Sequence, residues 1–344
     1  MSQPVALAVM GAGLIGKRHA KHVAASPNAV LAGIIDPMPA AEAVAREFGA
    51  PWFRDLDAAL AAGRPEGVIV ATPNRLHMRN GLDCIAAGIP VLVEKPLCDS
   101  VADAERLVAA AEAAGVPLLT GHHRRHNLLM QKAREIIASG AIGRPVVAHA
   151  MFWLCKPDDY FAVEWRREKG AGPVFVNLIH DVDNLRYLLG DVVAVTARDS
   201  NAIRGNAVEE TAVILLEFAS GVLATASVCD TTVAPWSWEM TTGENPAYPR
   251  TAESCYLIGG THGSLALPSL DLRRAQGARS WYSPFDLTRP GIRDEDPLAR
   301  QIAQFIRVIR GEEPPLVSGR DGLETLRVIE AVKRSAGDGL RIAL

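Results

Sequence analysis

The chain has 344 residues, of which 49% are hydrophobic and 22% are charged, and its formal net charge at pH 7 is −3. Because this length exceeds what one hydrophobic core usually serves, we expect two domains. The slightly negative charge leaves no bulk basic surface, so nucleic acid and anionic membranes are not expected as partners.

The cysteines and the N-terminus indicate the compartment. The five cysteines are odd in number and form no CxxC pair, a pattern that disfavours a disulfide framework or a zinc site and suits a reducing environment. The apolar N-terminus has no basic region before it and runs directly into glycines, so a buried strand is predicted there instead of a signal peptide. No uncharged apolar run reaches the length of a membrane span. The sequence therefore predicts a cytoplasmic protein.

Strand-like and helix-like segments alternate over the first 121 residues. The strand-like segments are short and apolar: Val5–Met10, 30–35, 67–71, Val91–Val93 and 117–120. Alanine-rich stretches with helical spacing lie between them, as at 75–87 and 99–114. Apolar strands with little alternation, separated by helices, indicate a parallel sheet covered on both faces. We therefore predict a doubly wound α/β domain of the Rossmann type over residues 1–122.

The pattern changes after residue 120. Amphipathic helices are predicted at Leu128–Ala138 and 173–189, and closing helices at 298–310 and 323–334. Strand pairs are predicted at Thr211–Phe218 with 222–228 and at 255–258 with 264–267, each pair around a glycine-containing turn. Long loops are expected at 235–249 and 276–296. Strands in series favour an α+β domain with a mainly antiparallel sheet over residues 123–344.

A glycine motif follows the first predicted strand and opens a helix. It consists of Gly11, Ala12, Gly13, Leu14, Ile15 and Gly16. In such a motif the first glycine permits a tight turn, the second lets the backbone approach a pyrophosphate, and the third allows close packing of helix and strand. The helix N-terminus faces the phosphate. The alternative is a glycine-rich turn without a ligand, but the surrounding strand and helix favour a dinucleotide site.

Asp36 ends the second predicted strand, twenty residues beyond Gly16. A carboxylate at this position can accept hydrogen bonds from both ribose hydroxyls of NAD and would repel the 2′-phosphate of NADP. It can also begin the turn at Pro37 and cap the next helix, and both roles can coexist. The sequence therefore predicts NAD as the cofactor, with NADP the less favoured form.

Two further motifs lie where predicted strands of the first domain end, at the edge where open α/β sheets bind ligands. They are Ala71-Thr72-Pro73-Asn74 with His77, and Glu94-Lys95-Pro96-Leu97. Together with the glycine motif, and with His180-Asp181 and Asp183 after a glycine-rich segment, they resemble the glucose–fructose oxidoreductase/inositol dehydrogenase (Gfo/Idh/MocA) family over nearly the whole chain. The resemblance implies that Thr72, Pro73, Asn74, His77, Glu94 and Lys95 contribute to cofactor binding.

The resemblance also implies the catalytic residues. The lysine of the Glu-Lys-Pro motif reaches the substrate hydroxyl and the nicotinamide ribose in that family, which makes Lys95 the predicted acid/base. His180 is the second catalytic candidate and a substrate contact. The family usually has an aspartate four residues before this histidine, where this chain has Val176, with Asn177 three residues before. On an α-helix both positions share the face of His180. We expect His180 to donate a hydrogen bond and Asn177 to assist it.

The run from Gly121 to Asn127 contains three histidines, His122, His123 and His126. No carboxylate or cysteine accompanies them at a helpful spacing, so no metal site is predicted. Substrate recognition and contact between the domains, by His123, Arg124 or Asn127, is the preferred interpretation. Trp165-Arg166 resembles a pair that borders the family's active site, and a surface cation–π contact is the alternative interpretation.

The resemblance implies hydride transfer between NAD and a hydroxyl-bearing carbon of a polyol, cyclitol, sugar or related ring diol. Two alternatives stay open. One is an enzyme that retains NAD and performs net non-redox turnover, and the other is a non-catalytic dinucleotide sensor. Neither 212–216 nor 222–228 carries a charged residue on either face. A sheet so apolar predicts a homodimer or homotetramer joined through the C-terminal sheet, as family members do, although loops or helices could also cover it.

Overall fold

The computed structural model describes residues 3–168 and 170–344, and the chain divides into two compact units. The first comprises Met1–Asn127 and Glu295–Leu326, and the second comprises Leu128–Asp294 and Arg327–Leu344. The last helix of the chain, α10 (Gly319–Asp338), begins in the first unit and ends in the second. The division into two domains after residue 122 stays a prediction. In the described residues, no helix combines the length and the apolar character needed to cross a membrane.

The first unit is built around a six-stranded parallel sheet with the order β3-β2-β1-β4-β5-β6. Its strands are β1 (Val5–Met10), β2 (Ala29–Ile35), β3 (Trp52–Phe53), β4 (Gly67–Val70), β5 (Val91–Val93) and β6 (Leu118–Thr120). The order reverses between β1 and β4, which is the switch point where open α/β sheets bind ligands. The predicted doubly wound parallel sheet is confirmed.

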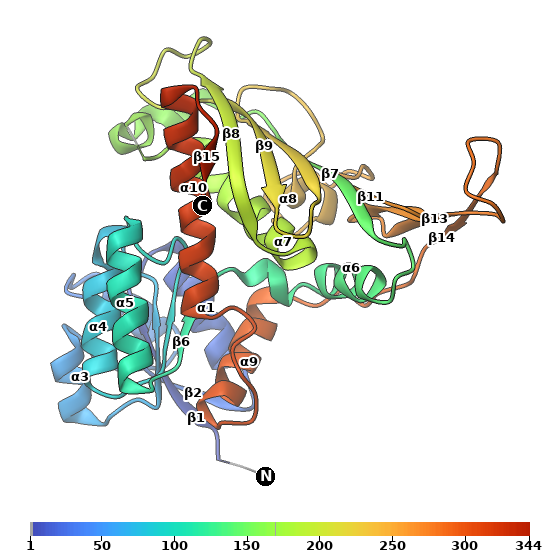
Figure 1. The fold of residues 1–344 in the computed structure, drawn as a ribbon. Coiled ribbons are helices and arrows are strands. Elements are labelled where there is room, and N and C mark those ends of the chain that lie inside the picture. The colour runs from blue at the N-terminus through green and yellow to red at the C-terminus, as the bar shows by residue number, and fades with distance from the viewer. Residues whose placement is uncertain (1–2, 169) are drawn as a thin grey trace. The chain divides into compact units, whose positions relative to one another are not determined.

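Helices cover both faces of this sheet. They are α1 (Leu14–Ala25), α2 (Ala41–Glu47), α3 (Leu56–Ala62), α4 (His77–Ala86), α5 (Val101–Ala114) and α9 (Pro297–Ile309). Helices α4 and α5 pack together, and α1 packs against α9 (Figure 1). Ile302 and Phe305 of α9 share a core cluster with β1 and β2. Helix α9 falls in the range predicted for the second domain, but its apolar face packs on the first sheet.

The second unit contains a nine-stranded sheet with the order β14-β13-β12-β11-β7-β10-β9-β8-β15. Its strands are β7 (Pro145–Trp153), β8 (Val192–Ser200), β9 (Thr211–Phe218), β10 (Leu223–Cys229), β11 (Tyr256–Gly260), β12 (Gly263–Leu267), β13 (Asp271–Ala275), β14 (Phe285–Thr288) and β15 (Ile342–Ala343). Among the described strands of this sheet, only β7 and β10 pair in parallel. The predicted mainly antiparallel sheet and both predicted hairpins are confirmed.

Three predictions for the second half need correction. Helix α6 (Leu128–Ala138) has its predicted bounds. In contrast, 173–189 is not one amphipathic helix, because a π-helical turn (Val174–Leu178) precedes α7 (Ile179–Leu189), and every residue of α7 is buried. The two predicted loops also contain regular structure. The loop at 235–249 holds α8 (Trp238–Thr242), whose N-cap is the Ser237 side chain, and the loop at 276–296 holds the edge strand β14.

Candidate functional site

The glycine turn has the geometry of a dinucleotide-binding loop. Gly11 has a φ of +101°, and a Cβ there would lie 2.5 Å from the Ala71 carbonyl oxygen. A Cβ on Gly16 would lie 1.9 Å from the Gly11 carbonyl oxygen. A Cβ on Gly13 would meet no atom within 4 Å. Two of the glycines are therefore required by packing, whereas Gly13 leaves open space at the N-terminus of α1, where a pyrophosphate fits.

Asp36 follows β2 and faces the same turn. Its Oδ2 accepts a hydrogen bond from the Ala12 N–H at 2.9 Å, and its Oδ1 accepts one from the Met38 N–H at 2.9 Å. An ionised carboxylate offers about four lone-pair sites, so it can still accept two ribose hydroxyls. The turn-forming role and the ribose-binding role are therefore compatible. The first unit thus presents a helix N-terminus, a glycine gap and an acid that together fit NAD.

The segment after β4 is tied to the segment after β5 by His77. The His77 side chain is buried, with Nδ1 2.8 Å from the Pro96 carbonyl oxygen and Nε2 2.8 Å from the Thr72 carbonyl oxygen. Thr72 Oγ1 also donates to Asn80 Oδ1 at 2.9 Å. His77 was predicted to contribute to cofactor binding. Its two hydrogen bonds connect the segment after β4 to the segment after β5 and hold them at a fixed separation.

Glu94 and Lys95 follow β5 directly. Lys95 is partly exposed, while the Glu94 carboxylate is buried. Glu94 Oε1 lies 2.6 Å from His19 Nε2, and Glu94 Oε2 accepts a hydrogen bond from the Lys95 N–H at 3.1 Å. Burial by itself would raise the pKa of Glu94, but the hydrogen bond and charge of His19, with the charges of His123 and Lys95, lower it to about 2. Glu94 is therefore an ionised internal group beside the predicted catalytic lysine.

Most of the run after β6 is buried, within and around a short 3₁₀ helix (His123–His126). Arg125 donates to Asp321 Oδ1 at 3.0 Å. Burial, helped by nearby positive charges, lowers the pKa of His126 to about 3. Arg124 is buried as well, whereas His123 is partly exposed. Across the described residues, no group of three or more metal-ligating side chains occurs.

In the second unit, His180 lies in the first turn of α7 and is buried. Val176 and Asn177 lie in the preceding π-helical turn. α-Helical spacing predicts that both positions share the face of His180, but a π turn adds about one residue per turn and changes which side chains align. The α-helical spacing assumed for Val176 and Asn177 is therefore absent from the backbone, and their alignment with His180 stays a prediction. Single π turns are often found at functional sites.

Sequence reasoning missed Lys156, which follows β7 in the second unit. Its Nζ donates to Asn177 Oδ1 at 3.0 Å and lies 3.1 Å from Asp230 Oδ2. Arg204 pairs with the other Asp230 oxygen at 2.6 Å. Burial lowers the pKa of Lys156, opposed by its contact with Asp230. The only sequence signal was a single lysine at the end of an apolar strand, because its partners lie far along the chain.

Trp165 and Arg166 lie in a 3₁₀ turn (Glu164–Arg167) of the same unit. The Arg166 guanidinium lies 4.1 Å from the Tyr160 ring centroid and 5.6 Å from the Trp165 ring centroid. Lys156 Nζ lies 5.1 Å from the Tyr160 ring centroid. The predicted cation–π contact is therefore present, and it connects the Trp-Arg pair to the Lys156 contacts through one ring.

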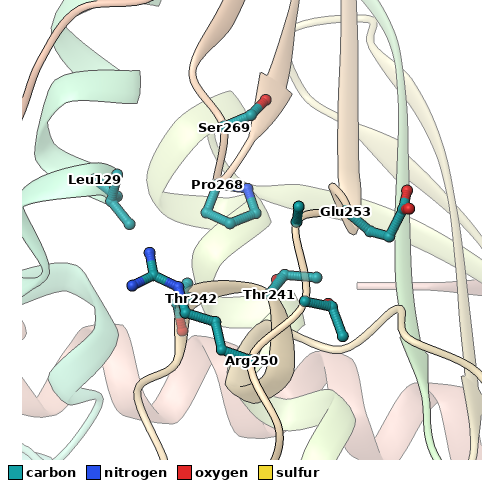
Figure 2. A pocket seen from close by; sticks show the side chains of 9 residues that line it. Leu129, Thr241, Thr242, Arg250, Glu253, Pro268 and Ser269 are labelled. Atoms are coloured by element: carbon teal, nitrogen blue, oxygen red, sulfur yellow. The ribbon is translucent and has the colours of Figure 1, made fainter.

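A cavity of about 450 Å³ lies elsewhere in the second unit, beside α8 and the turn before β13 (Figure 2). Its walls are formed by Leu129, Thr241, Thr242, Arg250, Thr251, Ala252, Glu253, Pro268 and Ser269. None of the predicted substrate-binding residues lines it, and Arg250 and Glu253 at its rim are exposed. The described structure therefore gives this cavity no connection to the predicted site.

Comparison with known proteins matches both halves of the chain to one family. Residues 5–122 match the family described as "Oxidoreductase family, NAD-binding Rossmann fold", and residues 130–266 match the "GFO/IDH/MocA C-terminal domain". Together these two matches cover well over half of the sequence.

Individual relatives are similar over most of their length. A 1,5-anhydro-D-fructose reductase of Ensifer adhaerens is 30% identical, covering 80% of this chain and 78% of that protein. A D-apiose dehydrogenase of Paraburkholderia graminis is 31% identical, with coverages of 85% and 76%. An inositol 2-dehydrogenase of Rhizobium meliloti is 30% identical, with 99% of each chain covered.

Two solved structures are similar to this chain over nearly its whole length. The WlbA dehydrogenase from Bordetella pertussis, in complex with NADH and UDP-GlcNAcA, has a TM-score of 0.78 and 28% identity, with 99% of each chain covered. GenD2 from gentamicin A biosynthesis, in complex with NAD, has the same TM-score and identity, with coverages of 100% and 97%.

Proposed function

Because this chain belongs to the Gfo/Idh/MocA oxidoreductase family, as its motifs indicated, we propose that it moves a hydride between NAD and a hydroxyl-bearing carbon of a polyol, cyclitol, sugar or related ring diol. The predicted enzyme class and cofactor are confirmed at the level of the family, which is an oxidoreductase family with an NAD-binding Rossmann fold. The relatives named for anhydrofructose, apiose and inositol support the substrate class.

The observation that carries the proposal is the position of Lys95. It lies two residues after the end of β5, a strand of the parallel sheet whose carboxyl edge also carries the glycine turn and Asp36. Bound NAD would supply the hydride-accepting nicotinamide carbon. The open space at Gly13 and the free lone pairs of Asp36 fit its pyrophosphate and ribose. Lys95 would take the hydroxyl proton as hydride leaves the same carbon.

Roles in the second unit follow from its hydrogen bonds. The oxygen of the Asn177 amide is occupied by the Lys156 ammonium, so Asn177 offers its N–H₂ group as a donor. We propose that His180 and Asn177 both donate to substrate oxygens. His123, Trp165 and Arg166 remain proposed substrate contacts. Arg124, which is 2% exposed, is the weakest of the predicted substrate contacts because its side chain is packed inside the protein.

The assembly proposal rests on one face of the nine-stranded sheet. Val213 and Leu215 of β9, Leu223 of β10, Val147 of β7 and Leu257 of β11 are 38% to 55% exposed. Strand register places all five on the same face. Their neighbours on the other face, among them Ala212, Ile214 and Ala224, are buried. A sheet face that exposes five large apolar side chains supports a homodimer, or a dimer of dimers, joined through this sheet.

A cytoplasmic location is likewise proposed. All five cysteines are free thiols, which a reducing compartment maintains. In particular Cys84 and Cys98 are buried, and burial raises the pKa of each thiol to about 12, with nearby carboxylates adding to the effect. Both thiols are therefore protonated and inert at neutral pH.

The test is a cofactor and substrate panel. Purified protein is incubated with NAD or NADP and with inositols, alditols, aldoses and uronic acids, and NADH or NADPH is followed by fluorescence. The proposal expects NADH from at least one ring or chain polyol and a preference for NAD. If NAD survives purification and turnover needs no added cofactor, the enzyme performs net non-redox chemistry. If NAD binds and no substrate is converted, the chain is a sensor, which the loss of the family aspartate at Val176 would then explain.

A further inference from the structure

We propose that His19 is a positioning residue for Lys95, acting through the buried Glu94 carboxylate to set both the location and the proton affinity of the lysine. The inference rests on the proposed function for its catalytic consequence, but the contacts that carry it lie wholly within the first unit. His19 belongs to α1, the helix that begins at the glycine turn. One helix would thus serve the cofactor at its first turn and the catalytic lysine at its second.

A single carboxylate links the two residues. His19 Nε2 lies 2.6 Å from Glu94 Oε1, and the side chains of His19 and Glu94 are 0% and 8% exposed. The second oxygen of Glu94 accepts the Lys95 N–H at 3.1 Å. The peptide that carries Lys95 is therefore linked to α1 through two consecutive hydrogen bonds and the side chains of His19 and Glu94. Charged hydrogen bonds of this kind are stronger than neutral ones when they are removed from water.

Glu94 has little room to leave this arrangement. A Cβ on Gly121, the residue after β6, would lie 2.9 Å from Glu94 Cα and 3.0 Å from Glu94 Oε2. Any side chain at position 121 would therefore clash with the Glu94 carboxylate. The glycine allows the end of β6 to pack closely against this carboxylate. The charged groups that act on Glu94 are His19 from α1, His123 from the turn after β6, and Lys95 itself.

The carboxylate also affects the charge of Lys95. A negative group one residue away favours the protonated ammonium, so the pH at which Lys95 becomes a free amine depends on whether Glu94 is ionised. Glu94 is ionised although it is buried, and His19 makes the largest lowering contribution to its pKa. Without His19, burial favours the neutral carboxyl. Loss of His19 and loss of the Glu94 charge should therefore have the same effect: the Lys95 side chain should become a free amine at lower pH.

The experiment measures the pH dependence of Lys95 reactivity directly and needs no substrate. The full chain is labelled with trace acetic anhydride across a pH series, and acetylation of each lysine is quantified by peptide mass spectrometry. In Glu94→Gln and His19→Ala the Lys95 labelling curve should move to lower pH, while Lys17 and Lys21 on α1 keep their curves. His19→Gln retains a neutral N–H donor, so its shift should be smaller than that of His19→Ala.

The matched control is His22→Ala on the same helix, because His22 pairs with Asp296 at 3.3 Å and does not contact Glu94. It should leave the Lys95 curve unchanged. Melting temperature and NAD titration check folding, and Glu94→Gln provides the test if His19→Ala does not fold. An unshifted Lys95 curve in Glu94→Gln, or equal curves in folded His19→Ala and in wild type, would overturn the proposal. Neither outcome depends on finding a substrate, so failure here is distinct from failure of the proposed function.

Once a substrate is found, kinetics give a second measurement. His19→Ala should lower kcat by about ten- to a hundredfold, the range expected when a catalytic group is displaced by roughly 1 Å or less, while Kd for NAD changes little. His19→Gln should recover part of that loss. A normal kcat in His19→Ala would contradict the positioning role.

Discussion

The ammonium of Lys156 donates to the side-chain oxygen of Asn177 at 3.0 Å, and this hydrogen bond fixes which way the amide faces. The same ammonium lies 3.1 Å from Asp230, which also binds Arg204. Two cations thus share one buried carboxylate. Where its family usually has an aspartate, this chain has Val176, and the next residue, Asn177, has an amide oriented by a lysine.

Lys156→Met tests that orientation. Methionine keeps the apolar stem but cannot donate, so Asn177 is free to turn its oxygen toward the substrate, where a donor is needed. We expect kcat/KM to fall by about tenfold, since one oriented hydrogen bond contributes roughly 1–1.5 kcal/mol. Binding of NAD should be unchanged. Lys132→Met, which removes an exposed surface pair with Glu135, is the control. Equal kinetics in the two variants would show that Lys156 has only a structural role.

Alanine substitutions at Gly16 and Gly13 of the glycine turn should have different effects, the first on stability and the second on NAD binding. Gly16→Ala places a Cβ 1.9 Å from the Gly11 carbonyl oxygen, so the helix must shift, and the melting temperature should fall by several degrees. Gly13→Ala meets no protein atom within 4 Å, so the fold should be retained. It should instead weaken NAD binding, because the methyl group occupies the pyrophosphate approach. Thermal melts and NAD titrations measure both effects. Unchanged NAD affinity in Gly13→Ala would contradict the placement of the cofactor.

His126 predicts a pH dependence of stability. Burial lowers its pKa from 6.5 to about 3, so the unfolded chain binds a proton below pH 6.5 that the folded chain does not bind until near pH 3. The free energy of unfolding should therefore fall as the pH is lowered from about 6.5 toward 3. Substitution of His126 by Asn removes this titration and should flatten that part of the curve, measured by urea unfolding at each pH. An equally steep decline in the variant would show that His126 is not its source.

Most of the fold could be predicted because the local sequence patterns agree with which residues are buried. The hairpin of β9 and β10 alternates buried and exposed residues around a glycine turn. The charged residues of α7 have the pattern of a solvent-facing stripe, so an amphipathic helix is predicted where the helix is fully buried. They pair with other residues of the chain instead, as Arg186 does with Asp191 at 2.7 Å and Asp181 with the Tyr256 hydroxyl.

The site was predictable where its signal is a contiguous motif, as at the glycine turn and the Glu94-Lys95 segment. It was not predictable where partners are distant. His19 and Glu94 are 75 residues apart, and Lys156 and Asn177 are 21 apart, with no shared pattern to connect them. The π turn before α7 likewise has the sequence pattern of an ordinary helix, so the alignment of Val176 and Asn177 could come only from the backbone.

The exposed sheet face predicts an oligomer of at least two chains. Light scattering at micromolar concentration should give a mass of twice or four times the 36.8 kDa of one chain. The double variant Val213→Lys and Leu223→Lys places charges on that face and should produce monomers that retain their fold. The control pair, Leu14→Lys and Met38→Lys, alters exposed apolar residues of the first unit. A single-chain mass for the wild type would contradict the proposed assembly.

The central claim is that Lys95 is the acid/base of an NAD-dependent oxidation. The most direct measurement compares wild type and Lys95→Ala for NAD affinity and for NADH formation with the best substrate of the panel. We predict nearly equal NAD affinity and a loss of turnover of about 10²–10⁴-fold, the usual contribution of a general acid or base. His180→Ala should lose less, since it donates a hydrogen bond only. Undiminished NADH formation by Lys95→Ala, or a larger loss in His180→Ala, would contradict the assignment.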